Sequence, residues 1–215
     1  AEEWDVARET ELRRNSSPVE ALFQSWELSE TRCGGCRRRG ASFAPQRLLC
    51  LPVAAGPAPS LQDCLRAYFG GEAMGEERGW RCPSCRQPRP FNKRLYLLRP
   101  PSVLLLSLKR FSGPPNPRRL NTPVVVPRRL ALRELNLGHP EVPLPAGGGE
   151  YTLYGLVAHH GGLAFGHYTA AVELEDGRWA ELDDAAFRLL SPDETDRLLR
   201  SHSPYILCYR STNPN

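Results

Sequence analysis

The sequence GHYTAAVELEDGRWAELDD, residues 166–184, has the pattern of a β-hairpin. Two runs in which apolar and polar side chains largely alternate flank the dipeptide Asp176-Gly177, which is typical of a tight turn between antiparallel strands. Further strand-like runs, bounded by Gly, Pro or Asp, lie at 47–53, 93–98, 103–111, 151–158 and 205–209. Strands joined by turns rather than by helices predict an antiparallel α+β domain with few helices.

Three helix starts are marked by a serine followed three positions later by an acidic residue. The pairs are Ser17 with Glu20, Ser60 with Asp63, and Ser191 with Glu194. After the first start, four apolar residues follow at helical spacing, and we expect this face to be core: Val19, Leu22, Phe23 and Trp26.

Net charge and composition indicate which partners this chain is expected to have. The 215 residues carry a formal net charge of +4, almost entirely from arginine, because only Lys93 and Lys109 are lysines. A charge of this size does not favour nucleic acid as a partner. Apolar runs such as 103–106 are far shorter than the roughly 20 residues that span a bilayer, so no membrane partner is expected. Residue 1 is Ala and the only Met is Met74, from which we expect a piece of a longer protein.

Seven cysteines without a secretory signal indicate a reducing compartment, and four of them form two CxxC pairs, Cys33 with Cys36 and Cys82 with Cys85. Two such pairs can complete a closed, structural zinc site, with a redox CxxC or chance pairing as the alternative. Seven arginines crowd the pairs. They either offset the formal charge of about −2 of a Zn(Cys)₄ centre or form a solvated or nucleic-acid-binding face. These are Arg32, Arg37, Arg38, Arg39, Arg81, Arg86 and Arg89.

The other three cysteines are expected to be structural, since Cys50 and Cys208 lie in apolar runs and Cys64 lies on the apolar stripe of a predicted helix. Cys64 has a reactive alternative, because it falls in the first turn of a predicted helix, where the pKa of a thiol is lowered.

His167 opens the first strand of the hairpin, and Asp183 and Asp184 end the second. A histidine beside a carboxylate on a neighbouring strand makes a general base and the group that orients it, whereas a surface histidine with two solvated aspartates is the alternative. A two-residue turn at Asp176-Gly177 puts Asp184 on the His167 face and turns Asp183 away. A three-residue loop or a β-bulge brings Asp183 to that face instead.

The order of these motifs resembles that of ubiquitin-specific proteases, which are papain-like cysteine peptidases. The resemblance covers nearly the whole chain and includes 17–23, 33–36, 60–69, 82–85, PPSVLLLSLKRF (100–111), YTLYGLVAHHGG (151–162), GHYTA (166–170), WAELDD (179–184) and 205–209. It implies an incomplete papain-like fold with a β-rich palm, 1–29 and 99–215, and zinc-binding fingers, about 30–98, that grip ubiquitin.

The resemblance also implies roles for individual residues. His167 is the general base, Asp183 rather than Asp184 orients it, and Gly166 and Tyr168 line the channel for the ubiquitin tail. A structural Zn²⁺ is held by the four paired cysteines.

The sequence also departs from the family pattern. The segment with the family's nucleophilic cysteine has no counterpart here, and Ser107 stands where the family commonly has His. We therefore expect this chain to supply the base, its Asp partner and the fingers of a cytoplasmic or nuclear deubiquitinase acting on ubiquitinated proteins, and to be inactive by itself. The alternatives are a catalytically inactive ubiquitin-binding relative or splice product, and a zinc-ribbon module that binds nucleic acid through Arg37 to Arg39.

Overall fold

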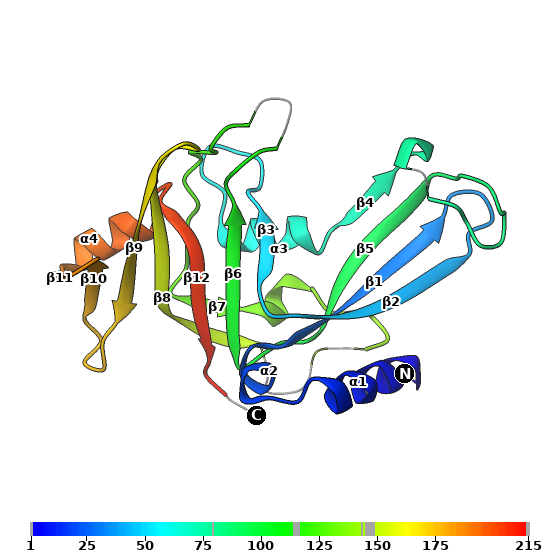
Figure 1. The fold of residues 1–215 in the computed structure, drawn as a ribbon, viewed down its shortest axis with the longest axis horizontal. Coiled ribbons are helices and arrows are strands. Elements are labelled where there is room, and N and C mark those ends of the chain that lie inside the picture. Colours follow the sequence, from blue (N-terminus) through cyan, green and yellow to red (C-terminus); the bar gives the residue numbers. More distant parts are fainter. Residues whose placement is uncertain (1, 79, 114–116, 143, 145–148, 214–215) are drawn as a thin grey trace.

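The strands form two sheets in a computed structural model that describes residues 2–78, 80–113, 117–142, 144 and 149–213 (Figure 1). The four-stranded sheet has the order β2-β1-β5-β4. Its strands are β1 (Ser25–Cys33), β2 (Arg39–Gln46), β4 (Gly71–Met74) and β5 (Phe91–Arg99).

The eight-stranded sheet has the order β11-β10-β9-β8-β12-β6-β3, with β7 also paired to β8. Its strands are β3 (Leu49–Pro52), β6 (Val103–Lys109), β7 (Arg129–Ala131), β8 (Glu150–Gly161), β9 (Gly166–Glu173), β10 (Trp179–Asp183), β11 (Ala186–Leu190) and β12 (Pro204–Ser211). Among these named strands, only β3 and β6 pair in parallel. The predicted α+β class with mostly antiparallel sheets is confirmed.

The described helices are short apart from the first. They are α1 (Glu2–Arg14), α2 (Pro18–Phe23), α3 (Leu61–Tyr68) and α4 (Pro192–Leu199), with 3₁₀ turns η1 (Glu76–Arg78) and η2 (Leu132–Leu135). The helix starts predicted at Ser60 and Ser191 are confirmed, and both form capping boxes, because each serine accepts from the N3 backbone and the N3 carboxylate accepts from the serine N–H. At Ser17, where a capping box was predicted, the serine side chain accepts from the N–H of Glu20. Nowhere in the described part of the chain does a helix have the length and apolar character needed to cross a bilayer.

The N-terminal helices differ from the prediction. Ser17 caps α2 as expected, but the helix ends at Phe23. Val19 and Leu22 are therefore 55% and 46% exposed, and Trp26 is buried in β1 instead, so the predicted helical core face is wrong. Helix α1 was not predicted because it has no apolar stripe. It docks through Trp4, whose ring packs edge-on against Trp26 with centroids 5.0 Å apart.

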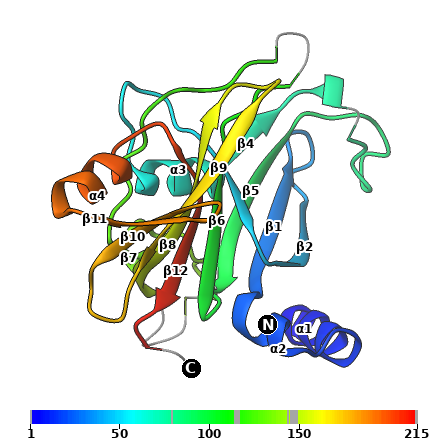
Figure 2. The same ribbon diagram turned by 60° about the vertical axis from the view of Figure 1, so that its left-hand side comes forward.

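Each sheet has its own hydrophobic core. The larger core joins the eight-stranded sheet to α3 and η2, and includes Leu65, Leu106 and Leu207. The smaller core lies in the four-stranded sheet around Trp26 and Tyr96. The four-stranded sheet projects to one side of the larger sheet (Figures 1 and 2). The expected finger range of about 30–98 is thus interrupted, because β3 joins the larger sheet and α3 packs against β3.

Candidate functional site

The hairpin of β9 and β10 has a three-residue loop. Leu174 N–H donates to the Arg178 carbonyl at 2.7 Å, which leaves Glu175, Asp176 and Gly177 as the loop, with Gly177 at a φ of +81°. The strands then pair Glu173 with Trp179 and Ala170 with Leu182. Because side chains alternate along a strand, this register puts Asp183 on the same face as Thr169 and His167. The odd loop length decides which aspartate reaches the histidine.

His167 and Asp183 are in direct contact. Nε2 of His167 lies 2.5 Å from Oδ1 of Asp183, and both side chains are about half exposed. The hydrogen bond to Asp183, and then its negative charge, hold the pKa of His167 above its usual range, with a smaller contribution from Asp184. Because Nε2 is engaged with the carboxylate, Nδ1 is the nitrogen left to accept a proton from a reacting group.

Asp184 leaves the strand instead of continuing it. Asp183 pairs with Ala186, so Asp184 begins a two-residue turn into β11, and its φ of 49° lies in the left-handed region that aspartate tolerates. Potential ligand atoms of His167, Asp183 and Asp184 nevertheless lie within 4.8 Å of one another. A second carboxylate therefore lies close to the pair formed by His167 and Asp183.

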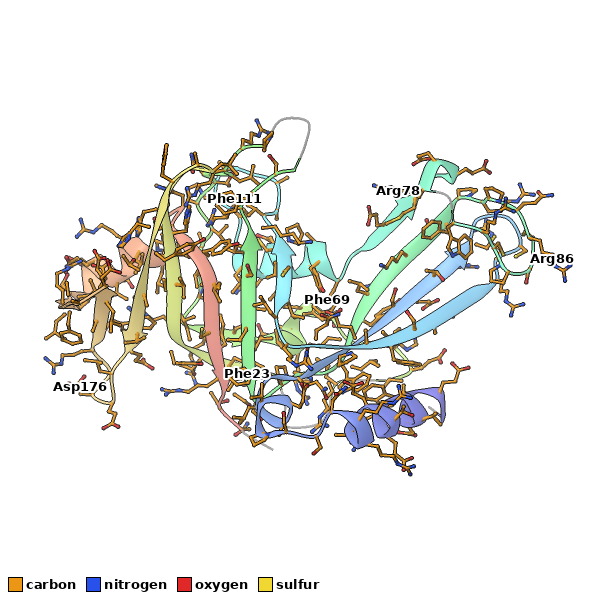
Figure 3. The ribbon with its side chains drawn as sticks, viewed as in Figure 1. Phe23, Phe69, Arg78, Arg86, Phe111 and Asp176 are labelled. Carbon is orange, nitrogen blue, oxygen red and sulfur yellow. The ribbon has the colours of Figure 1, made fainter. Side chains whose placement is uncertain are left out.

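Tyr168 lies on the opposite face of β9 from His167. It pairs with His159 of β8, and the two rings are 4.8 Å apart between centroids. Phe111 and Tyr205 complete the cluster, at 5.3 Å and 6.2 Å from the His159 ring. Figure 3 places Phe111 at the end of the sheet away from Asp176, which marks the far tip of the hairpin. An aromatic cluster therefore backs the strand that carries His167.

Gly166 is in close contact with this cluster. A Cβ at Gly166 would lie 2.0 Å from Nε2 of His159, so only glycine fits there. His159 is 3% exposed, and burial, followed by the charge of Arg119, holds its pKa below its usual range. His159 was not singled out from the sequence, although its place directly after the apolar run 151–158 is a signal of burial.

Two arginines hold the backbone around this cluster. Arg110 is fully buried, and it donates to the carbonyls of Pro204, Leu120 and Thr122. Burial lowers the pKa of Arg110 to about 10, which leaves it charged at neutral pH. Arg119 donates to the carbonyls of His159 and His202. The loop after β6 is thereby fastened to β8 and to the chain entering β12.

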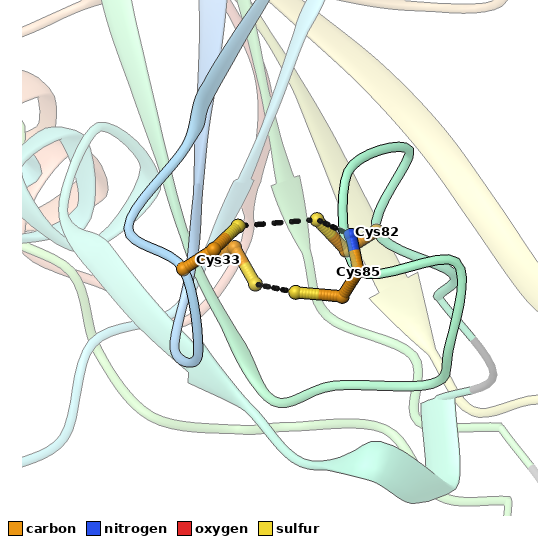
Figure 4. A group of neighbouring side chains, drawn as sticks. Cys33, Cys82 and Cys85 are labelled. Carbon is orange, nitrogen blue, oxygen red and sulfur yellow. Dashed lines mark hydrogen bonds between the residues drawn. The ribbon is translucent and has the colours of Figure 1, made fainter.

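The two CxxC pairs meet at the far end of the four-stranded sheet (Figure 4). Sγ of Cys33 lies 3.9 Å from Sγ of Cys85, and Sγ of Cys36 lies 3.6 Å from Sγ of Cys82. A tetrahedron with Zn–S bonds of about 2.3 Å has sulfurs about 3.8 Å apart, so the four thiols fit such a centre. Four close cysteines that converge in this way are able to bind a metal ion.

Local chemistry supports a cation among these sulfurs. The N–H of Cys85 donates to Sγ of Cys82 and lowers the pKa of that thiol to about 6. The contact of Cys85 with Cys36, followed by its burial, raises the pKa of Cys85 to about 11, and a bound cation relieves such crowding of thiolates. Nε of Arg89 is buried without a hydrogen-bond partner and lies near Gly35, the residue that Sγ of Cys85 also approaches. The side chain of Arg89 therefore lies close to the thiol of Cys85, beside Gly35.

Comparison with known proteins places the chain in a family. A family model described as "Ubiquitin carboxyl-terminal hydrolase" matches residues 2–209. The chain belongs to the ubiquitin carboxyl-terminal hydrolase family. It is 32% identical over 211 residues to mouse ubiquitin carboxyl-terminal hydrolase 17-like protein B, covering 97% of this chain and 42% of the relative. It is also 36% identical over 163 residues to human ubiquitin carboxyl-terminal hydrolase 19, covering 72% of this chain and 12% of that protein.

Solved structures agree with this assignment to the hydrolase family. The SAGA DUB module of Ubp8, Sgf11, Sus1 and Sgf73 bound to monoubiquitin superposes with a TM-score of 0.75 and 25% identity, covering 94% of this chain and 43% of the matched chain. The same module bound to ubiquitin aldehyde gives a TM-score of 0.77 at 24% identity, covering 94% of this chain and 44% of that chain. The chain thus spans less than half the length of these relatives.

Enzymes of this family are cysteine-type. Among the described residues, the side chains grouped with His167 are Asp183 and Asp184, and no cysteine belongs to that group. All seven cysteines are among the described residues, and four of them are in the CxxC pairs. Burial raises the pKa of both Cys64 and Cys208, and Cys64 accepts from the N–H of Ala54, as expected for structural thiols. Cys50 on β3 is four strands from β9, on the order of 20 Å at the usual strand spacing.

Proposed function

We propose that this chain provides the general base of a deubiquitinating cysteine peptidase, which hydrolyses the bond after the C-terminal glycine of ubiquitin. His167 is the base and Asp183 its orienting partner. The contact between Nε2 of His167 and Asp183 carries the proposal, since it leaves Nδ1 to work on a thiol. Because the described thiols lie elsewhere, the nucleophile comes from a polypeptide segment outside this chain.

The reaction then follows from these assignments. Nδ1 of His167 takes the proton of the attacking thiol, and the thiolate adds to the carbonyl carbon of the ubiquitin C-terminus. The imidazolium gives that proton to the leaving amine as the C–N bond breaks, which leaves a thioester. Water, deprotonated by the same nitrogen, then hydrolyses the thioester and returns the free thiol. Asp183 stabilises the imidazolium formed in both halves of the reaction.

Ubiquitin binding is divided between the two sheets in this proposal. The Ubp8 module, bound to monoubiquitin in a solved structure, supports ubiquitin as the partner. Gly166 and Tyr168 line the channel for the ubiquitin tail, a role supported by their place directly before and after His167 in β9 and by the 53% exposure of Tyr168, whose ring lies on the other face of the strand. The palm corresponds to 1–29 and 99–215, and the fingers, about 30–98 apart from β3 and α3, grip the body of ubiquitin.

A structural Zn²⁺ bound by Cys33, Cys36, Cys82 and Cys85 holds the fingers in shape. The support for zinc is the sulfur spacing together with the closed four-thiol set, which leaves no position for a substrate. All seven cysteines are described and none forms a disulfide, which agrees with a reducing compartment such as the cytoplasm or the nucleus.

The test uses the full-length translation product of the native transcript together with this chain. The full-length product should hydrolyse ubiquitin conjugates and should lose turnover in the variant His167→Gln. This chain alone should bind ubiquitin saturably in an NMR titration without turnover. Ubiquitin binding by a full-length product that has no turnover would establish the inactive ubiquitin-binding alternative instead.

A further inference from the structure

The net positive charge of this chain comes from the two segments that carry the CxxC pairs. Segments 31–39 and 81–89, here called the fingertip, hold seven of the 28 basic residues and none of the 24 acidic ones. The rest of the chain, with 21 basic residues, therefore carries a net charge of −3. A zinc ion with four thiolates has a formal charge of about −2, so the fingertip with its seven arginines has a net charge of about +5.

Most of these arginines are not neutralised by neighbours. In the described part of the chain, Arg39 has the only fingertip ion pair, 3.5 Å from Glu30. Arg38 donates to the hydroxyl of Ser84 and Arg81 to the carbonyl of Arg86, both of which are uncharged. Figure 3 shows Arg86 at the end of the four-stranded sheet farthest from the larger sheet. The fingertip arginines are thus exposed at the outer end of the four-stranded sheet, apart from the half-buried Arg89.

The backbone is strained at two of the fingertip arginines. Arg37 and Arg86 directly follow the second cysteine of their pairs, and their φ values are 63° and 56°. Each N–H closes its turn, to the carbonyl of Cys33 at 3.1 Å and of Cys82 at 2.8 Å. Glycine adopts this left-handed conformation freely, whereas a side chain with a Cβ does not. Both turns carry arginine where glycine is more stable, and strain retained in this way points to function.

We infer that the fingertip is a docking surface for an acidic segment of a partner protein. Guanidinium groups bind carboxylates through paired hydrogen bonds, which suits a cluster of Asp and Glu side chains. A short acidic segment contacts only the fingertip. A nucleic-acid duplex is longer and also comes near the rest of the chain, whose net charge of −3 repels it. The inference goes beyond the proposed hydrolysis and does not depend on it.

The test measures binding of a fluorescein-labelled peptide of twelve glutamates to the zinc-loaded chain by fluorescence anisotropy. The decisive variant is R37G/R86G, because glycine relieves the strain in both turns and the fingertip stays folded. Its affinity for the peptide should fall at least about tenfold, with unchanged zinc content and no fall in the unfolding temperature. The control R129A/R200A removes two exposed arginines outside the fingertip and should bind like the parent.

Three results would overturn the inference. The first is no saturable peptide binding at low salt. The second is equal binding by the parent and R37G/R86G. The third is tighter binding of a labelled twelve-base-pair DNA duplex than of the peptide, with the same dependence on Arg37 and Arg86, which would identify nucleic acid as the partner. Peptide binding that weakens equally in R129A/R200A also contradicts a local surface, since it reflects net charge alone.

Discussion

Replacing Gly166 with alanine tests whether His159 fixes the position of His167, the proposed general base. The new Cβ would lie 2.0 Å from Nε2 of His159, and ordinary contact begins at 3.4 Å, so the two groups must separate by about 1.4 Å. The His159 ring has little room to move, because it is 3% exposed and packs against Phe111 and Tyr168. Overpacking of this kind costs about 1–3 kcal/mol.

We therefore expect strand β9 to move rather than the His159 ring. His167 moves with it, because it directly follows Gly166 in the strand. A displacement of this size breaks the 2.5 Å hydrogen bond to Asp183. Since that bond is the main cause of the raised pKa of His167, the pKa should fall toward its usual value in Gly166→Ala. An NMR pH titration of the His167 imidazole measures this change, and urea unfolding measures the loss of stability.

The matched control is Gly162→Ala in the same β8–β9 connection, because a Cβ at Gly162 meets nothing within 4 Å. That variant should leave both measurements unchanged. The double variant Gly166→Ala/His159→Ala removes the clashing ring and should recover part of the lost stability. A Gly166→Ala protein with parental stability and an unchanged His167 titration would refute the reasoning.

Three further predictions concern the metal, the histidine pair and the thiols. Cys33→Ala should lose zinc in native mass spectrometry, and full zinc retention in this variant would contradict the four-cysteine site. Chelation should unfold the fingers before the palm, since metal binding contributes on the order of 10 kcal/mol to such sites. Asp183→Asn should lower the pKa of His167 more than Asp184→Asn does, because Asp183 supplies the hydrogen bond. The raised pKa also means that the pair stabilises the fold at acidic pH, and that this contribution disappears as pH rises through the folded-state pKa, so the effect of Asp183→Asn on unfolding should be largest below that value. An electrophilic ubiquitin probe should not label this chain, and labelling that disappears in Cys64→Ser would show that the buried thiol is reactive.

Several elements could be predicted because their signals are local. The capping boxes at Ser60 and Ser191 lie within four residues of chain, and the structure contains both. The alternating pattern of 166–173 predicts a strand for the same reason. Strand β1 and its neighbour β2 were missed, because sequences such as SWELSETRC carry few β-branched residues and become strands through pairing with each other and with β5.

The sequence by itself determined the alternating patterns of strands, the residues that cap helices, the two CxxC pairs and the candidate residues His167, Asp183 and Asp184. It did not determine which aspartate meets the histidine, since a change of one residue in loop length reverses the face of every side chain in the returning strand. The tertiary structure decided that question through the three-residue loop, and it alone brought His159 against Gly166 and sulfurs 52 residues apart, those of Cys33 and Cys85, into contact. Local sequence patterns specify the helices and strands. The register between strands, and the side chains that meet at a site, depend on packing between residues that are distant in the chain.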